Sequence, residues 1–336
     1  MSSEQEPTGR GRGRGHGHGR GRRGRGQSIW RGGRGGRGRG RGSFHNGQQS
    51  EAKQALAIIA SQTQVALPYI LKDLPSLKAD ESELLALNAD LPQLKVEDCP
   101  KHPKATIKII NEDTFDAAIS MMASDDSNAT NNPPSRPAVL NLASDTSPGG
   151  GWLNGAMAQE EALCYRSSLS LSLHKKYYPW NVMQGIYTRD VVVIRSSTEQ
   201  GHKLVAPDKP ANELPVVSVL SVAALRRPDV SDGDVLSSGT KKKVFAEKAD
   251  RDLTKKKMEL VLRMAASRGH DRLVLGALGC GAFKNPADDV AECWKEVFEQ
   301  QEFQGGWWKE ICFAVMDRRN EGNFEVFEKT LGGLGV

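Results

Sequence analysis

A run of three glycines, Gly149 to Gly151, limits the fold of this chain more than any other feature, because it separates a predicted strand from a predicted helix. The apolar residues 137–144 ahead of the run are typical of a short buried strand. Residues 159–169 behind it have the apolar spacing of a helix. Glycine lets backbone N–H groups approach an anion closely, and a helix start adds positive potential there. The sequence therefore predicts an anion-binding turn.

Two carboxylates, Glu160 and Glu161, open the helix that follows this turn. Two acids would repel a phosphate, so they indicate a ligand that must also be protonated or held by its hydroxyls. Adjacent helical residues project about 100° apart, so we expect the two side chains not to face one atom. One acid would then transfer a proton while the other binds hydroxyls or orients the ligand.

A second glycine loop, Gly279-Cys280-Gly281-Ala282-Phe283, follows the apolar run 273–278. Neither loop has the Gly-x-Gly-x-x-Gly pattern with a following acidic residue, and a Walker pattern is absent, which argues against a nicotinamide or P-loop site. Two such loops would suit a diphosphate held from both sides.

Apolar runs alternate with helical patterns along the rest of the chain. The predicted strands are 105–110, 137–144, 191–194, 216–222, 273–278 and 311–316, and the predicted helices include 113–123, 243–267, 286–300 and 324–331. Residues 225–238 are expected to form a surface loop. This alternation predicts a three-layer α/β/α domain with its ligand at the carboxyl edge of the sheet.

Residues 1–50 differ in composition from everything that follows. They hold 17 glycines and 12 arginines but only Glu4 and Glu6 as acids, a net charge of +10. Because the whole chain carries +5, residues 51–336 carry −5. Such a segment is expected to be disordered, and residues 9–42 suit RNA, single-stranded nucleic acid or another polyphosphate. A solubilising tail without a dedicated ligand is the alternative.

Cysteine usage and hydropathy indicate the cellular compartment in which the protein is expected to work. Cys99, Cys164, Cys280, Cys293 and Cys312 show no CxxC pair and no histidine at metal-ligand spacing, so neither a disulfide framework nor a zinc site is predicted. No apolar run reaches the roughly 20 residues of a membrane span, and no signal sequence is visible. We expect an intracellular protein of the nucleus, the cytoplasm or both.

The trio Gln159-Glu160-Glu161, seven residues after the glycines, resembles the motif of the microbial-type poly(ADP-ribose) glycohydrolase family. The resemblance covers residues 51–336 and is strongest over 139–173 and 273–286, although Leu278 stands where that family often has tryptophan. It implies a macrodomain-like mixed sheet, with residues 51–104 as an N-terminal helical extension and 105–336 as the core. It also implies an enzyme without a metal or cofactor, and we expect a monomer.

The resemblance implies hydrolysis of the ribose–ribose O-glycosidic bond of poly(ADP-ribose). Glu161 would protonate the leaving ribose oxygen, and Glu160 would hold ribose hydroxyls. The implied substrate-binding residues are Asn141, Gly149, Gly150, Gly151, Gln159, Gly279, Cys280, Gly281, Ala282 and Phe283. Cys280 is expected to be a small buried residue rather than a nucleophile, because no histidine partner is identifiable.

Other functions fit parts of the same pattern. A hydrolase that removes single ADP-ribose units from protein or nucleic acid would use the same acid. A non-catalytic reader of ADP-ribose would have no evident use for Glu161. An RNA-binding protein with an inert domain would depend on the arginine-rich tail alone. These functions can be distinguished by testing whether the protein cleaves polymer and whether substitution of Glu161 abolishes the cleavage.

Overall fold

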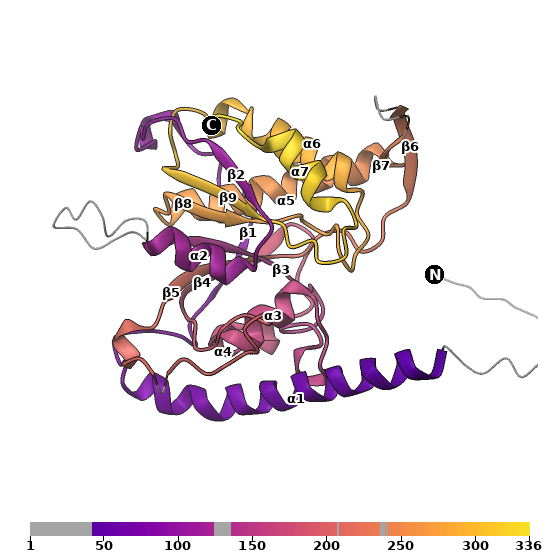
Figure 1. The fold of residues 1–336 in the computed structure, drawn as a ribbon. Helices are drawn as coiled ribbons and strands as arrows, with labels where there is room; N and C mark the ends of the chain where they lie inside the picture. Colours follow the sequence, from indigo (N-terminus) through magenta and orange to yellow (C-terminus); the bar gives the residue numbers. More distant parts are fainter. Residues whose placement is uncertain (1–41, 124–135, 207, 236–238, 240) are drawn as a thin grey trace, which may run out of the picture. The chain divides into compact units, whose positions relative to one another are not determined.

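The computed structural model describes residues 42–123, 136–206, 208–235, 239 and 241–336 (Figure 1). The predicted arginine-rich tail therefore lies almost wholly outside the described residues. The first helix, α1 (Gly42–Lys72), begins at Gly42 and not at the predicted boundary of residue 51. Among the described residues, no helix is both long and apolar enough to cross a membrane.

A seven-stranded mixed sheet forms the centre of the domain, in the order β1-β4-β5-β3-β8-β9-β2. The strands are β1 (Glu83–Ala86), β2 (Ile107–Ile110), β3 (Ala138–Leu142), β4 (Gln184–Val192), β5 (Val216–Val222), β8 (Arg272–Leu275) and β9 (Glu310–Ala314). From β5 to β2 all neighbours are parallel, whereas β4 is antiparallel to both β5 and β1. The predicted α/β sheet is confirmed and is mixed, as the family resemblance implied.

Helices cover both faces of this sheet and complete the three layers (Figure 1). One face is covered by α5 (Lys248–Ser267), α6 (Ala287–Phe298) and α7 (Asn323–Leu331). The other carries α1, α2 (Thr114–Ala123), α3 (Gln159–Arg166) and α4 (Leu169–Ser172). Strand residues such as Val139 and Val219 are fully buried, because side chains on each face pack against a helical layer.

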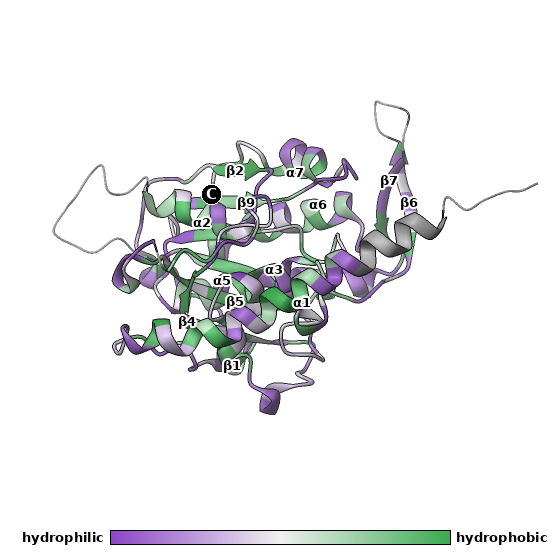
Figure 2. Cartoon of the chain, turned by 60° about the horizontal axis from the view of Figure 1, so that its bottom comes forward, coloured by the Kyte–Doolittle hydropathy of each residue, from purple (hydrophilic) through white to green (hydrophobic). Residues whose placement is uncertain are grey.

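The structure of residues 225–245 differs from the predicted loop and helix start. The predicted loop and helix start contain a hairpin of β6 (Val230–Val235) and β7 (Lys241–Phe245), and α5 begins only at Lys248. The hairpin is largely hydrophilic in Figure 2, and nearly all of β6 is exposed. Strands without a buried face lack the apolar alternation by which a strand is recognised.

The parallel arrangement brings both glycine loops to the same edge of the sheet. β3 and β8 are adjacent and parallel, so the segments that follow Leu142 and Leu275 leave from neighbouring carboxyl ends. Arg166, almost completely buried at the end of α3, donates to Asp113 and Asp116 beside the start of α2. These ion pairs fix α3, and with it the two predicted acids, against the sheet.

Candidate active site

The first glycine loop turns sharply between β3 and a 3-10 turn, η3 (Trp152–Asn154). Gly150 has φ +57°, which disfavours any side chain. A Cβ at Gly150 would lie 2.4 Å from Oε1 of Glu161 and 3.1 Å from Oε2 of Glu160. Trp152 is buried and packs against Tyr165 with ring centroids 6.2 Å apart, so it supports the loop from beneath.

Both predicted acids point at this loop. Oε1 of Glu161 accepts the Gly151 N–H at 2.8 Å, and Oε2 of Glu160 accepts the Ser144 N–H at 2.8 Å. The prediction that adjacent glutamates cannot face one position is therefore wrong, because two flexible side chains converge on Gly150 although their Cα–Cβ bonds diverge. Oε2 of Glu161 and Oε1 of Glu160 are buried without a hydrogen-bond partner among the described residues.

The environment of Glu160 favours its protonated form. Burial is the main cause that raises its pKa to about 8, and the charge of Glu161 adds to the rise. Hydrogen bonds from Ser144, Asn141 and Gly149 partly oppose it. Glu160 is only 3% exposed, so at neutral pH its carboxyl is mostly protonated and can donate one hydrogen bond.

The backbone N–H groups of the first loop already donate hydrogen bonds within the protein. The Gly149 N–H interacts with Glu160, the Gly151 N–H bonds Glu161, and the Gly150 N–H bonds the Ser147 carbonyl at 2.9 Å. These N–H groups are therefore committed inside the protein. The expectation that both glycine loops offer free amides to a diphosphate does not hold for this loop.

Two further predicted residues lie at the end of β3. Asn141 is fully buried and donates to the Ser221 hydroxyl at 3.0 Å, and its Oδ1 has no partner among the described residues. Gln159 accepts the Leu142 N–H at 2.9 Å and donates to the Leu140 carbonyl at 2.8 Å. Its amide joins α3 to β3, so the structure gives Gln159 a positioning role.

The second glycine loop has the free amides that the first lacks. In the part of the chain that the structure describes, no hydrogen bond is donated by the N–H groups of Gly281, Ala282 and Phe283. Gly281 and Ala282 are exposed, Phe283 is half-buried, and Cys280 is buried as expected. A Cβ at Gly281 would meet no atom within 4 Å, so this side of the loop is open to a ligand.

Side chains hold the second loop in place. Gly279 has φ +79° and packs against Asn285, whose Nδ2 donates to the Leu225 carbonyl at 2.6 Å. The guanidinium of Arg226 lies 4.7 Å from the centroid of the Phe283 ring, and 3.8 Å separates it from Asp145 in the segment leading to the first loop. The two loops are thus neighbours at the carboxyl edge of the sheet.

An aromatic pair missed by the sequence analysis lies beside the acids. The Tyr178 hydroxyl and the Trp180 indole N–H are buried without partners among the described residues. The two ring centroids lie 4.8 Å apart, and the backbone N–H of Trp180 donates to the Asp145 carbonyl at 3.1 Å. Burial and then the charge of Glu160 raise the pKa of Tyr178, which places its phenol within electrostatic reach of that acid. No local pattern in the sequence signals this role.

Lys257 of α5 holds the segment that carries this pair. Its ammonium donates to the Val182 carbonyl at 2.7 Å, and its side chain is almost completely buried. Burial lowers the pKa of Lys257 to about 8, while the charge of Asp145 opposes the shift.

Lys257 is expected to make stability rise with pH above about 8. The unfolded state keeps the ordinary value of 10.5, so between 8 and 10.5 it binds more protons than the folded state. Over this window the wild type should gain about 3 kcal/mol of unfolding free energy relative to Lys257→Met, measured by urea denaturation at each pH. A constant difference between pH 7 and 10.5 would contradict this expectation.

Gly150→Ala is expected to lower the rate of any reaction that depends on Glu161 by at least about a hundredfold, because the new methyl group would displace the Glu161 carboxyl group. Gly201→Ala is the matched control. Gly201 has φ +81°, the same kind of backbone strain, but an added Cβ there meets no atom within 4 Å. The two variants should lose similar stability in thermal melts, and equal activities would contradict the predicted clash.

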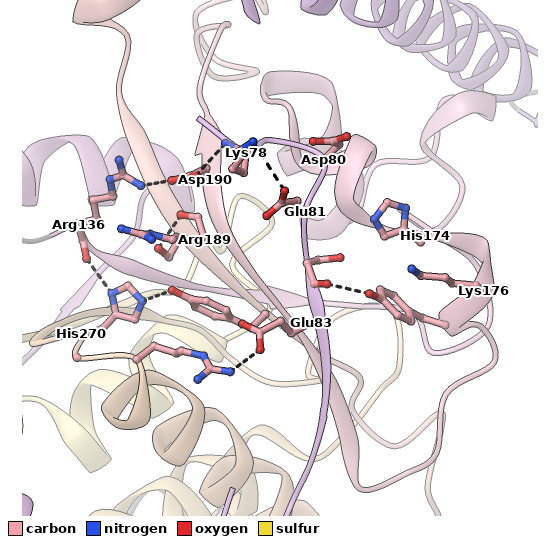
Figure 3. Close-up of a pocket in the computed structure, with 16 residues that line it drawn as sticks. Lys78, Asp80, Glu81, Glu83, Arg136, His174, Lys176, Arg189, Asp190 and His270 are labelled. Carbon is pink, nitrogen blue, oxygen red and sulfur yellow. Dashed lines mark hydrogen bonds and ion pairs between the residues drawn. The ribbon is translucent and has the colours of Figure 1, made fainter. Parts of the chain in front are cut away.

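An open space with a volume of about 1210 Å³ lies at the opposite, amino edge of the sheet (Figure 3). Its inner polar groups satisfy one another. Asp190 pairs with Arg136 and accepts the Lys78 N–H at 3.0 Å, and Tyr187 lies 2.9 Å from Nε2 of His270. Among the described residues this cavity has no buried carboxyl oxygen without a partner, unlike the glycine loops, so we expect the chemistry at the loops.

Metal ligation finds no support in the described residues, where no group of three or more His, Cys, Asp or Glu side chains is placed to hold an ion. All five cysteines are buried and free of disulfides.

Comparison with protein families finds a match between residues 39–196 and the family described as microbial-type PARG, catalytic domain. A comparison with curated proteins found no match. Among solved structures, poly(ADP-ribose) glycohydrolase from Thermomonospora curvata superposes with a TM-score of 0.64 at 23% identity, covering 82% of this chain and 99% of that one. The same enzyme bound to the inhibitor ADP-HPD gives 0.61 at 24%, with the same coverage.

The enzyme from Deinococcus radiodurans in complex with ADP-ribose is also similar. It gives a TM-score of 0.57 at 27% identity, covering 74% of this chain and 94% of that one. The resemblance predicted from the two glycine loops is thereby confirmed.

Proposed function

We propose, on the premise that residues 39–196 belong to the microbial-type poly(ADP-ribose) glycohydrolase family, that this chain hydrolyses the ribose–ribose bonds of poly(ADP-ribose) and releases ADP-ribose. The observation that carries the proposal is the pair Glu160 and Glu161, both buried at Gly150, each with one carboxyl oxygen held and one free of partners. The likeness to a glycohydrolase with an inhibitor bound supports the same activity.

The proposed mechanism gives each acid a separate task. Glu161 transfers its proton to the oxygen that links the two riboses, and the bond from that oxygen to the anomeric carbon breaks. An oxocarbenium-like centre forms and water adds to it, returning a proton to the Glu161 carboxylate. Glu160, protonated at neutral pH, donates one hydrogen bond to a ribose hydroxyl and accepts another.

The diphosphate of the bound unit would lie at the second loop. The N–H groups of Gly281, Ala282 and Phe283 are free there, whereas those of the first loop hold the acids. Asn141, with an unpartnered Oδ1 at the end of β3, would complete the ribose subsite. The mixed sheet and the ligand position at its carboxyl edge support assigning the fold to the macrodomains.

Incubation of automodified poly(ADP-ribose) with the wild type and Glu161→Ala tests the activity. The wild type should release ADP-ribose, while the variant should bind the polymer without cleaving it. Binding without cleavage by both proteins would instead identify a reader. Release only of single units attached to protein would identify a mono-ADP-ribosyl hydrolase.

We also propose that residues 9–42 bind RNA or another single-stranded polyphosphate, because spaced arginines give a strong, salt-dependent attraction. Removal of residues 1–41 should abolish RNA retention on filters while leaving hydrolysis intact. We place the protein inside the cell, in the nucleus or cytoplasm, because five free cysteines suit a reducing compartment. We further propose a monomer, which size-exclusion chromatography with light scattering would check.

A further inference from the structure

Arg226 stands between the two glycine loops. Its guanidinium lies 4.7 Å from the centroid of the Phe283 ring and 3.8 Å from Oδ1 of Asp145. The Arg226 side chain is 58% exposed, and that of Asp145 is 38% exposed. An ion pair so long and so exposed is weak, so Arg226 keeps most of its capacity to bind another anion.

Two more cations lie nearby in the sequence: Arg227 follows Arg226 in the segment after β5, and Lys284 follows Phe283 of the second glycine loop. Arg227 and Lys284 are exposed, and within the described part of the chain neither forms an ion pair. The segment after β5 is joined to the second glycine loop because the Arg227 backbone N–H donates to the Phe283 carbonyl at 2.8 Å. We call Arg226, Arg227 and Lys284 the basic rim.

The basic rim stands out from the rest of the domain. Residues 51–336 carry a net charge of −5, yet these three cations lie beside the second glycine loop, and Arg226 also contacts Asp145 ahead of the first. A cluster of cations in a generally acidic surface attracts a polyanion to that place. The free amides at Gly281 to Phe283 are the groups that we assign to the diphosphate of the catalytic unit, and the three rim charges are not part of that assignment.

A chain of ADP-ribose units carries one diphosphate in every unit. When one unit occupies the catalytic site, the unit joined to it continues from the ribose beside Glu161, and Arg226 lies on that side of the site through its contact with Asp145, ahead of the first loop. The diphosphate of the joined unit carries two negative charges into that region. A guanidinium that can turn from a weak carboxylate contact to a phosphate is chemically suited to hold it.

We propose that the basic rim binds the diphosphate of the ADP-ribose unit adjacent to the unit being released, and so favours polymer over a single ADP-ribose. This inference rests on the proposed function. The basic rim would select the substrate, whereas Glu160 and Glu161 would carry out the hydrolysis.

Charge reversal in the full-length protein tests this assignment. Arg227→Glu/Lys284→Glu should raise KM for polymer about tenfold, leave kcat unchanged, and reduce the slope of log(kcat/KM) against log[salt] by at least about 1. The dissociation constant of free ADP-ribose, measured by calorimetry, should change by less than about twofold. Lys101→Glu/Lys329→Glu removes two exposed cations at the amino edge and should leave all these values unchanged.

Each contrary result has one meaning. A rim variant with wild-type KM and salt slope would overturn the inference, provided that the wild type cleaves polymer. Equal weakening of polymer and ADP-ribose would also overturn it, because the rim would then belong to the catalytic unit's own site. Failure of the wild type to cleave polymer would instead contradict the proposed function.

Discussion

Glu161→Gln is expected to lower kcat/KM on poly(ADP-ribose) by about 10³-fold, while affinity for ADP-ribose changes by less than about threefold. Glutamine can still accept the Gly151 N–H through its oxygen, so the loop keeps its shape. It cannot give up a proton, so only the chemical step should suffer. Release of ADP-ribose under single-turnover conditions separates the two effects.

Glu160→Gln is the matched variant for this experiment. Because Glu160 is mostly protonated at neutral pH, an amide replaces it with nearly the same shape and the same ability to donate. We expect a loss of less than about tenfold at pH 7. If Glu160→Gln is the inactive variant and Glu161→Gln retains turnover, the two roles are exchanged.

Glu160→Gln should also change the pH dependence of stability by a large amount. The carboxyl titrates near 4.5 when unfolded and at about 8 when folded, so between these values the folded state binds more protons. Unfolding free energy therefore falls as pH rises through this window, by about 5 kcal/mol relative to a variant that cannot ionise. Above pH 8 the loss is complete, and below 4.5 it is absent.

Chemical denaturation of the wild type and Glu160→Gln at several pH values between 4 and 9 measures this difference. The glutamine variant should become progressively more stable than the wild type up to pH 8. Parallel stability curves would show that burial does not hold the proton on Glu160, and the proposed hydrogen-bond donor would be lost.

The fold could be predicted where burial leaves a local pattern. The run 216–222 and the first half of the run 273–278 lie in a sheet covered on both faces, so nearly every residue is apolar and each run predicts a strand directly. The pairing direction of β4 is set by distant strands, and no local signal reports it. In the hairpin, β6 is almost wholly exposed and β7 has only Phe245 buried, so the hairpin lacks the apolar alternation that would predict it.

The site was predictable in its chemistry but not in its internal connections. The glycines and the two acids were identified because residue type alone limits what they can do. That the first loop uses its amides on Glu160 and Glu161 depends on side-chain torsions, which spacing along a helix does not fix. Tyr178 comes within electrostatic reach of Glu160 only through the tertiary fold, where Lys257 bonds the Val182 carbonyl just after the aromatic pair.

A crystal structure of Glu161→Gln soaked with ADP-ribose tests the central claim most directly. The diphosphate should accept hydrogen bonds from the N–H groups of Gly281 to Phe283, and the distal ribose should lie within hydrogen-bond distance of residues 160 and 161. ADP-ribose bound instead in the cavity beside Arg136 and His270, or on the first loop with the acids displaced, would contradict the account.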